Sequence, residues 1–181
     1  GPEQDVPDNI SPFEFIPWLL GKCANLAEAR KLLARIHLTG TPFAPDLPAA
    51  PLHWLIADKT GAITVEAVRE GLRIYGNPVG VLTNNPPFPM QMHNLTRYLS
   101  LSAKPPVNRF APGLSLQPDS LGMGALGLPG DLSSQSRFVR AAFTKGNARP
   151  GTTERENVGQ FLNIMDNVAQ TRGCLLYTSD A

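Results

Sequence analysis

Leu52–Val68, with the sequence LHWLIADKTGAITVEAV, is the stretch that decides the fold class. It holds two runs rich in apolar and β-branched residues, separated by the turn sequence KTG at residues 59–61. Two such runs around a short glycine-containing turn predict an antiparallel β-hairpin. A further short β element is expected at Leu72–Tyr75, and VGVLT at Val79–Thr83 predicts another strand. The hairpin disfavours a plain helical interaction module.

Helical signals lie on both sides of this hairpin. Capping boxes, in which an N-cap side chain is followed three residues later by glutamate, begin at Ser11, Asn25 and Thr153. Helices are expected at Phe13–Leu20, Leu26–Leu38, Gln91–Leu101, Ser133–Phe143 and after Thr153. Pro17 is expected to kink or end the first of them. The last helix is expected to turn Val158, Phe161, Leu162, Met165 and Val168 toward the core. Hairpin strands flanked by helices predict a layered α+β domain rather than a doubly wound parallel sheet.

The composition is that of a globular domain with many loops. Hydrophobic residues make up 42% of the 181, enough to build a core, and the 18 prolines and 16 glycines predict long connections. The net charge is +1 without a basic run, so no nucleic-acid partner is expected. No apolar run approaches the roughly 20 residues that span a bilayer, and residues 1–9 lack a signal-peptide pattern. No membrane partner is therefore expected.

Familiar cofactor and metal patterns do not occur. The sequence has no P-loop, no G-x-S-x-G, no H-E-x-x-H and no G-x-G-x-x-G after a strand. Cys23 and Cys174 have neither metal-ligand spacing nor the density of a disulfide scaffold, and they are expected to be free thiols. The histidines, His37, His53 and His93, are scattered. Neither a metal nor an organic cofactor is expected.

The segment VLTNNPPF, which begins at Val81, is the first candidate for chemistry. Asparagine and proline are ordinary turn residues, and a plain turn is one interpretation. The other is that Asn84 aims its side-chain amide into a site, where it would donate a hydrogen bond to a developing oxyanion.

The segment PGDLSSQSRFVRAAF, which ends at Phe143, is the second candidate. By itself it predicts an amphipathic helix with exposed Arg137 and Arg140. The functional interpretation is a fixed guanidinium close to a reacting carbonyl or to the anionic end of a substrate, because its planar fork suits oxygen recognition.

Together and in this order, the segments resemble the choloylglycine hydrolase family, which includes conjugated bile acid hydrolases and penicillin V acylases. The resemblance covers most of residues 8–173. It is carried by DNISPFEFIPWLLGKC, LHWLIADKTGAITVEAV, NPVGVLTNNPPFPMQMHNLTRYLSLS, GLPGDLSSQSRFVRAAF and ENVGQFLNIMDNVAQTRG. It implies an N-terminal nucleophile hydrolase fold, an αββα sandwich of two stacked antiparallel sheets between layers of helices.

The resemblance also implies site residues. Asn84 would correspond to the oxyanion-hole asparagine of the T-N-x-P turn, and Arg137 to the arginine of the S-R-F motif near the nucleophile. The neighbouring Asn85 and Arg140 are not expected to act. Phe43 and Leu47 would help to wall the substrate pocket. The implied activity is hydrolysis of glycine- or taurine-conjugated bile acids, with penicillin V or another N-acyl amide as the alternative substrate.

The family nucleophile, a cysteine at the first position of the processed chain whose α-amine serves as base, has no counterpart at Gly1. We therefore expect residues 1–173 to be the middle and C-terminal part of a single domain without its N-terminal strands. Residues 174–181 would be a tail foreign to the family, and the alternative is a divergent strand, because Leu-Leu-Tyr-Thr is a fair β run. A non-catalytic remnant is the rival interpretation, and the chain alone is expected to be poorly soluble or partly folded. For the full-length protein, the resemblance implies a cytoplasmic enzyme and a homotetramer. The length and stiffness of Ser102–Ser120 make this loop a candidate assembly arm.

Overall fold

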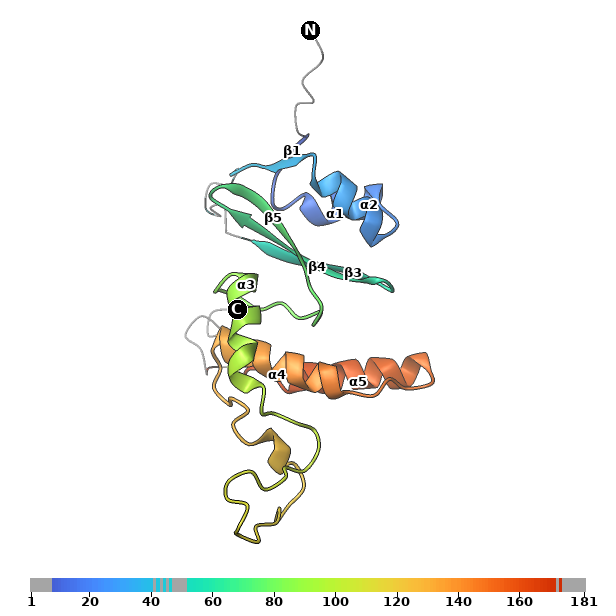
Figure 1. Cartoon of the computed structure of the whole chain (residues 1–181). Coiled ribbons are helices and arrows are strands. Elements are labelled where there is room, and N and C mark those ends of the chain that lie inside the picture. The colour runs from blue at the N-terminus through green and yellow to red at the C-terminus, as the bar shows by residue number, and fades with distance from the viewer. Residues whose placement is uncertain are drawn as a thin grey trace. The chain divides into compact units, whose positions relative to one another are not determined.

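A computed structural model of the chain describes residues 8–40, 42, 44, 46, 52–171 and 173. The predicted pocket-wall residues Phe43 and Leu47 lie outside the described residues, as does Cys174. The chain forms two compact units, Gly1–Leu82 and Thr83–Ala181. Figure 1 shows the helices and strands of each unit.

A three-stranded antiparallel sheet forms the centre of the first unit. It contains β3 (His53–Asp58), β4 (Gly61–Val68) and β5 (Gly71–Gly76) in the order β3-β4-β5. The register pairs Asp58 with Gly61 and Val68 with Gly71, so both connections are tight. The predicted hairpin and the short β element after it are therefore confirmed.

Two short helices pack on this sheet. These are α1 (Phe15–Lys22) and α2 (Leu26–Leu33), and β1 (Asp8–Ile10) pairs in parallel with β2 (Ile36–Leu38) beside them. Apolar side chains from all these elements form one buried core, which contains Ile10, Phe15, Leu19, Leu26, Ala29, Leu33, Ile36, Trp54, Ile63 and Val65. Asp58, at the end of β3, accepts a hydrogen bond of 2.8 Å from the backbone N–H of Leu26. The sheet thus caps the N-terminus of α2.

Three details differ from the sequence predictions. Pro17 lies within α1 without ending it, because it occupies the first turn, where backbone N–H groups have no acceptor inside the helix. The predicted helix Leu26–Leu38 ends at Leu33, and Ile36–Leu38 is a strand. The predicted strand Val79–Thr83 does not form.

The buried side chain of Asn77 explains the last difference. Its Nδ2 donates to the carbonyl of Val81 at 2.9 Å, and its Oδ1 accepts from the N–H of Gly80 at 2.7 Å. One side chain therefore binds backbone groups that a sheet would otherwise pair, and the segment becomes a fixed loop.

The second unit is helical, with a long loop between its helices. It contains α3 (Phe88–Asn94), the 3-10 turns η1 (Leu95–Tyr98) and η2 (Met123–Ala125), α4 (Ser134–Asn147) and α5 (Glu154–Asp166). Helix α4 contacts both α3 and α5. Phe88 and Phe138 meet edge to face with ring centroids 6.2 Å apart, and both are buried. The predicted capping box of Thr153 and Glu156 is formed, and the side chain of Ser133, for which no capping role was predicted, caps α4.

Helix α5 does not turn its apolar residues toward a core. Its stripe of Val158, Phe161, Leu162 and Met165 is exposed, with 59% of Phe161 accessible, and none of the residues of α5 is buried. The prediction that these side chains face the core is wrong for the part of the chain that the structure describes. Their helical spacing was right, but spacing alone does not say what covers a helix face.

The loop between η1 and η2 is ordered by its own hydrogen bonds. The amide of Asn108 donates to the carbonyls of Ala111 and Leu114, at 3.0 and 2.6 Å, and its Oδ1 accepts from two backbone N–H groups. At the loop base, Ser102 N–H donates to the carbonyl of Gly124 at 2.8 Å. A Cβ atom on Gly124 would lie 2.4 Å from the carbonyl oxygen of Ser102, so only glycine fits this close approach.

Candidate functional site

The candidate site forms where the segment before α3 meets the first turn of α4. Asn84 lies in the first segment, just before the cis peptide bond between Asn85 and Pro86. Arg137 lies one turn into α4, whose start is fixed by the Ser133 cap. The structure brings these two predicted residues into direct contact although 53 positions separate them in the chain.

The contact is a hydrogen bond that sets the orientation of the Asn84 amide. Arg137 Nη2 donates to Asn84 Oδ1 at 2.8 Å, while Arg137 Nε donates to the carbonyl of Leu132 at 3.1 Å. The guanidinium is therefore held at two points. Because a guanidinium can only donate, Oδ1 is the atom that faces it, and Nδ2 is the other end of the amide. Such an amide presents its N–H groups as donors for an anionic oxygen.

The backbone of Asn84 is held as firmly as its side chain. Its carbonyl oxygen accepts from Ser134 Oγ at 2.8 Å and from Gln91 Nε2 at 3.1 Å. Thr83 Oγ1 donates to the carbonyl of Ser134 at 3.1 Å, which ties the same segment to α4. The segment is thus joined to both α3 and α4 by polar contacts.

The sequence predictions did not find Gln91, Ser134 or Thr83. A weak signal was present for Gln91, which lies at helical spacing from Phe88 and Leu95 and is therefore a polar residue on an apolar helix face. Ser134 is one of the serines in the SSQS sequence at the start of the predicted helix, and the pattern gave none of them a role of its own.

Arg140, one turn after Arg137, has a different environment. It is 7% exposed, and its guanidinium donates to the carbonyls of Asn167, Pro129 and Asp131 at 3.0, 2.9 and 2.6 Å. All of these partners are backbone groups, so Arg140 joins the loop before α4 to the C-terminal end of α5. That Arg137, and not Arg140, serves the site stays a prediction.

Asp131 strengthens the N-terminal end of α4. Its carboxylate accepts from the N–H of Ser133 at 2.9 Å and from the hydroxyl of Ser136 at 2.6 Å. Hydrogen bonds from the side chains of Ser133 and Ser136 lower the pKa of Asp131 to about 2. The carboxylate is therefore ionised at neutral pH, where negative charge near a helix N-terminus is favourable.

Cys23 does not have the environment of a nucleophile. Its thiol is half-buried and donates to the carbonyl of Leu19 at 2.9 Å. Burial, and then the charge of Glu28, raises the pKa of this thiol. The reactive form of cysteine is the thiolate, so a raised pKa keeps Cys23 unreactive near neutral pH.

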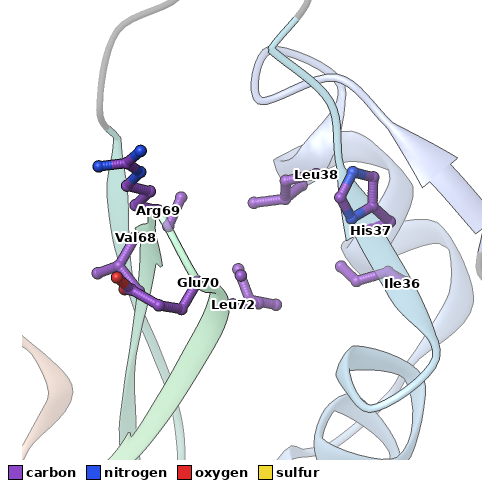
Figure 2. A pocket seen from close by; sticks show the side chains of 9 residues that line it. Ile36, His37, Leu38, Val68, Arg69, Glu70 and Leu72 are labelled. Carbon is purple, nitrogen blue, oxygen red and sulfur yellow. The ribbon is translucent and has the colours of Figure 1, made fainter.

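The first unit also has an open hollow of about 370 Å³. Figure 2 shows Ile36, His37 and Leu38 of β2 on one side of it, and Val68, Arg69, Glu70 and Leu72 on the other. In the described part of the chain, no group of three or more histidine, cysteine or carboxylate side chains could hold a metal ion. Nor does any described helix have the length and apolar character needed to cross a membrane.

Comparison with known proteins gives a consistent result. A family model described as linear amide C–N hydrolases, choloylglycine hydrolase family, matches residues 2–181. A bile salt hydrolase/transferase of Lactiplantibacillus plantarum is 53% identical over 91% of this chain and 51% of its own length. A conjugated bile acid hydrolase of Lactobacillus acidophilus is 32% identical over 93% of this chain and 54% of its own length. The chain thus spans about half the length of the curated relatives it matches.

Solved structures agree with these matches. A mutant of conjugated bile acid hydrolase from Clostridium perfringens superposes with a TM-score of 0.81 and 34% identity, covering 96% of this chain and 53% of that chain. Penicillin V acylase from Agrobacterium tumefaciens superposes with a TM-score of 0.68 at 20% identity, which shows the fold alone, over 96% of this chain and 48% of that chain. The expected α+β fold of the N-terminal nucleophile hydrolases is confirmed.

Proposed function

Because the chain belongs to the choloylglycine hydrolase family of linear amide C–N hydrolases, we propose that its whole protein cleaves the amide bond of glycine- or taurine-conjugated bile acids. The observation that carries the proposal is the hydrogen bond between Arg137 and Asn84. It gives the predicted oxyanion donor a defined orientation, in a chain that is 53% identical to a bile salt hydrolase/transferase.

In the proposed reaction, the N-terminal cysteine that the family resemblance implies attacks the carbonyl carbon of the amide. Its α-amine takes the thiol proton and passes it to the leaving nitrogen, because an α-amine with a pKa near 8 can do both at neutral pH. The C–N bond breaks, glycine or taurine leaves, and a thioester remains. Water then gives a proton to the α-amine as its oxygen adds to the thioester carbonyl carbon. The C–S bond breaks, the sulfur takes that proton back, and the free bile acid is released.

Asn84 has its role in both halves of this reaction. Each half passes through a tetrahedral intermediate whose carbonyl oxygen carries negative charge, and Asn84 Nδ2 would donate to that oxygen. A donor fixed before the reaction is effective because it need not reorganise as charge develops. Arg137 supplies the fixation through Oδ1, and its positive charge near the site also favours the oxyanion.

The activity is tested with the protein at its natural length. Terminal sequencing and intact mass establish whether that protein begins with a processed cysteine. Rates are then compared on glycocholate, taurocholate and penicillin V. Penicillin V is included because the chain shares its fold with a penicillin V acylase. We expect faster cleavage of the conjugated bile acids. Equal or faster cleavage of penicillin V would contradict the substrate proposal, and an N-terminus other than cysteine would contradict the mechanism.

The role of Asn84 is tested in the same protein. Asn84→Ala is expected to lower kcat about 10²- to 10³-fold, as loss of one oxyanion donor does elsewhere. Asn85→Ala is the matched control, because Asn85 is the neighbouring asparagine and is also exposed. It is expected to keep kcat within a few fold. Similar losses in both variants would indicate that the turn, and not the Asn84 amide, is what matters.

We also propose that the loop Ser102–Ser120 mediates self-association of the whole protein. The loop is ordered around Asn108 and yet exposes apolar side chains, among them Phe110 with 86% of its surface accessible. Ordered loops with exposed apolar groups are typical of contact surfaces. Phe110→Ser is expected to reduce the mass measured by light scattering without a loss of kcat, and an unchanged mass would contradict the proposal.

A further inference from the structure

We propose that Gln91 is a positioning residue for the oxyanion donor, acting on Asn84 through its peptide carbonyl from a buried place on α3. Ser134, at the start of α4, is a second positioning residue that acts on the same carbonyl. The inference rests on the function proposed above for Asn84, and it adds residues that do not touch the reacting atoms.

Gln91 is unusual for its degree of burial. Only 1% of its surface is accessible, although glutamine is mostly found on protein surfaces. Its Nε2 lies within hydrogen-bond distance of three oxygens, at 3.2 Å from Thr83 Oγ1, 3.1 Å from Asn84 O and 3.2 Å from Ser134 Oγ. All of these oxygens belong to the segment that carries Asn84 or to the helix start that faces it.

The other end of the Gln91 amide supports a positioning role. Among the residues that the structure describes, Oε1 of Gln91 is buried without a hydrogen-bond partner. An unsatisfied buried carbonyl destabilises a fold, so methionine, which has a similar size, would serve packing better at this position. What methionine cannot supply is the pair of N–H groups that hold the Asn84 segment.

Ser134 acts on the same carbonyl from the opposite helix. Its Oγ lies 2.8 Å from Asn84 O and 2.9 Å from Thr83 Oγ1. Asn84 O therefore has a donor from α3 and a donor from α4, while Arg137 holds Oδ1 of the same residue. The side chain of Asn84 is itself exposed, so its own packing does not fix it. These three contacts together supply the orientation that an oxyanion donor needs.

The expected kinetic result follows from this arrangement. Gln91→Met in the protein at its natural length is expected to lower kcat about 10- to 100-fold, as small misplacements of a catalytic group do, with KM within about twofold of the unchanged protein. The matched control is Gln135→Met, the same chemical change at an exposed position in the first turn of α4. It is expected to leave kcat unchanged.

A double-mutant cycle separates positioning from a structural role. If Gln91 acts through Asn84, Gln91→Met loses its effect on kcat once Asn84 is replaced by alanine. Equal fold-losses in the presence and absence of the Asn84 side chain would overturn the inference, and so would an unchanged kcat in Gln91→Met alone. If Asn84→Ala itself keeps full activity, the proposed function of Asn84 fails, which is a distinct result.

Ser134 keeps the test decisive if Gln91→Met does not fold. Ser134→Ala removes the hydroxyl that reaches Asn84 O, while Ser134→Thr retains it. We expect Ser134→Ala to lower kcat about 10-fold, an effect that disappears with Asn84→Ala, and Ser134→Thr to restore most of the activity. Equal activity in the alanine and threonine variants would overturn the inference.

Discussion

Replacing Arg140 by methionine is expected to destabilise the protein far more than the same change at Arg137. Arg140 is buried and donates to three backbone carbonyls, so its removal leaves those oxygens without their donor. A hydrogen bond to a charged group contributes about 1.5–3 kcal/mol. The carbonyls belong to residues that are partly or fully exposed, so water replaces part of the loss. We therefore expect the free energy of unfolding to fall by about 2–4 kcal/mol.

Arg137 is the matched control because it is the same residue type, one turn earlier on the same helix. It is half-buried and makes one bond to a backbone carbonyl and one to a side chain. Arg137→Met is expected to cost about 1 kcal/mol or less of stability. If the proposed function is right, it nevertheless lowers kcat strongly, while Arg140→Met keeps most of its kcat per folded molecule.

The assay is urea unfolding of the protein at its natural length, followed by circular dichroism, with kcat measured under native conditions. The free energy of unfolding of Arg140→Lys is expected to lie between those of Arg140→Met and the unchanged protein. The ammonium keeps the charge but lacks the planar fork that reaches several carbonyls. Equal losses of stability at the two arginines would refute this reasoning, as would an Arg140→Met variant within about 0.5 kcal/mol of the unchanged protein.

Two further predictions concern the first unit. Hydrogen bonds from the Thr60 side chain and the Leu26 N–H lower the pKa of Asp58 to about 2 from an ordinary value of 3.8, so the folded state binds this proton more weakly than the unfolded state. The stabilisation by Asp58 is thus complete above about pH 4 and lost as the pH falls to about 2. The stability difference between the unchanged protein and Asp58→Asn should shrink over that range in acid titrations, and a constant difference would contradict it. Burial raises the pKa of Cys23, so its alkylation at pH 7 is expected to be slower than that of a free cysteine, and Cys23→Ser is expected to keep full activity. A large loss of kcat in that variant would show that this thiol takes part in the reaction.

Elements whose stabilising contacts are close in sequence could be predicted from the sequence. The predicted Asn25 cap forms, with Glu28 N–H donating to Asn25 Oδ1 at 3.0 Å, while the Glu28 carboxylate accepts from the backbone N–H of Ala24 at 2.9 Å, one residue before the cap. The register of the hairpin around the KTG turn could also be predicted, because it depends on the length of the turn and not on distant residues. Family resemblance added Asn84 and Arg137, whose contact no local pattern could reveal.

The rest depends on contacts between distant parts of the chain. Asn77 prevents the strand at Val79–Thr83 through its side chain, and an asparagine four residues before a carbonyl is not a recognisable signal. Gln91 could be identified as a polar residue on an apolar helix face, but its partners on Asn84 and Ser134 could not. Helical spacing also predicted the apolar stripe of α5 without indicating that it is exposed.

Because Ser102 and Gly124 lie close together, the long loop between them can be exchanged as a unit. Its two ends meet at one backbone hydrogen bond, and the chain between them is ordered by contacts of its own, such as those of Asn108. Loop length carries only a small entropic cost once the ends are joined, so a longer, shorter or foreign loop can be inserted at this point. The segment that carries Asn84 and the helix that carries Arg137 need not change with it. One part of the chain is thus open to new surface properties while the oxyanion donor keeps its geometry.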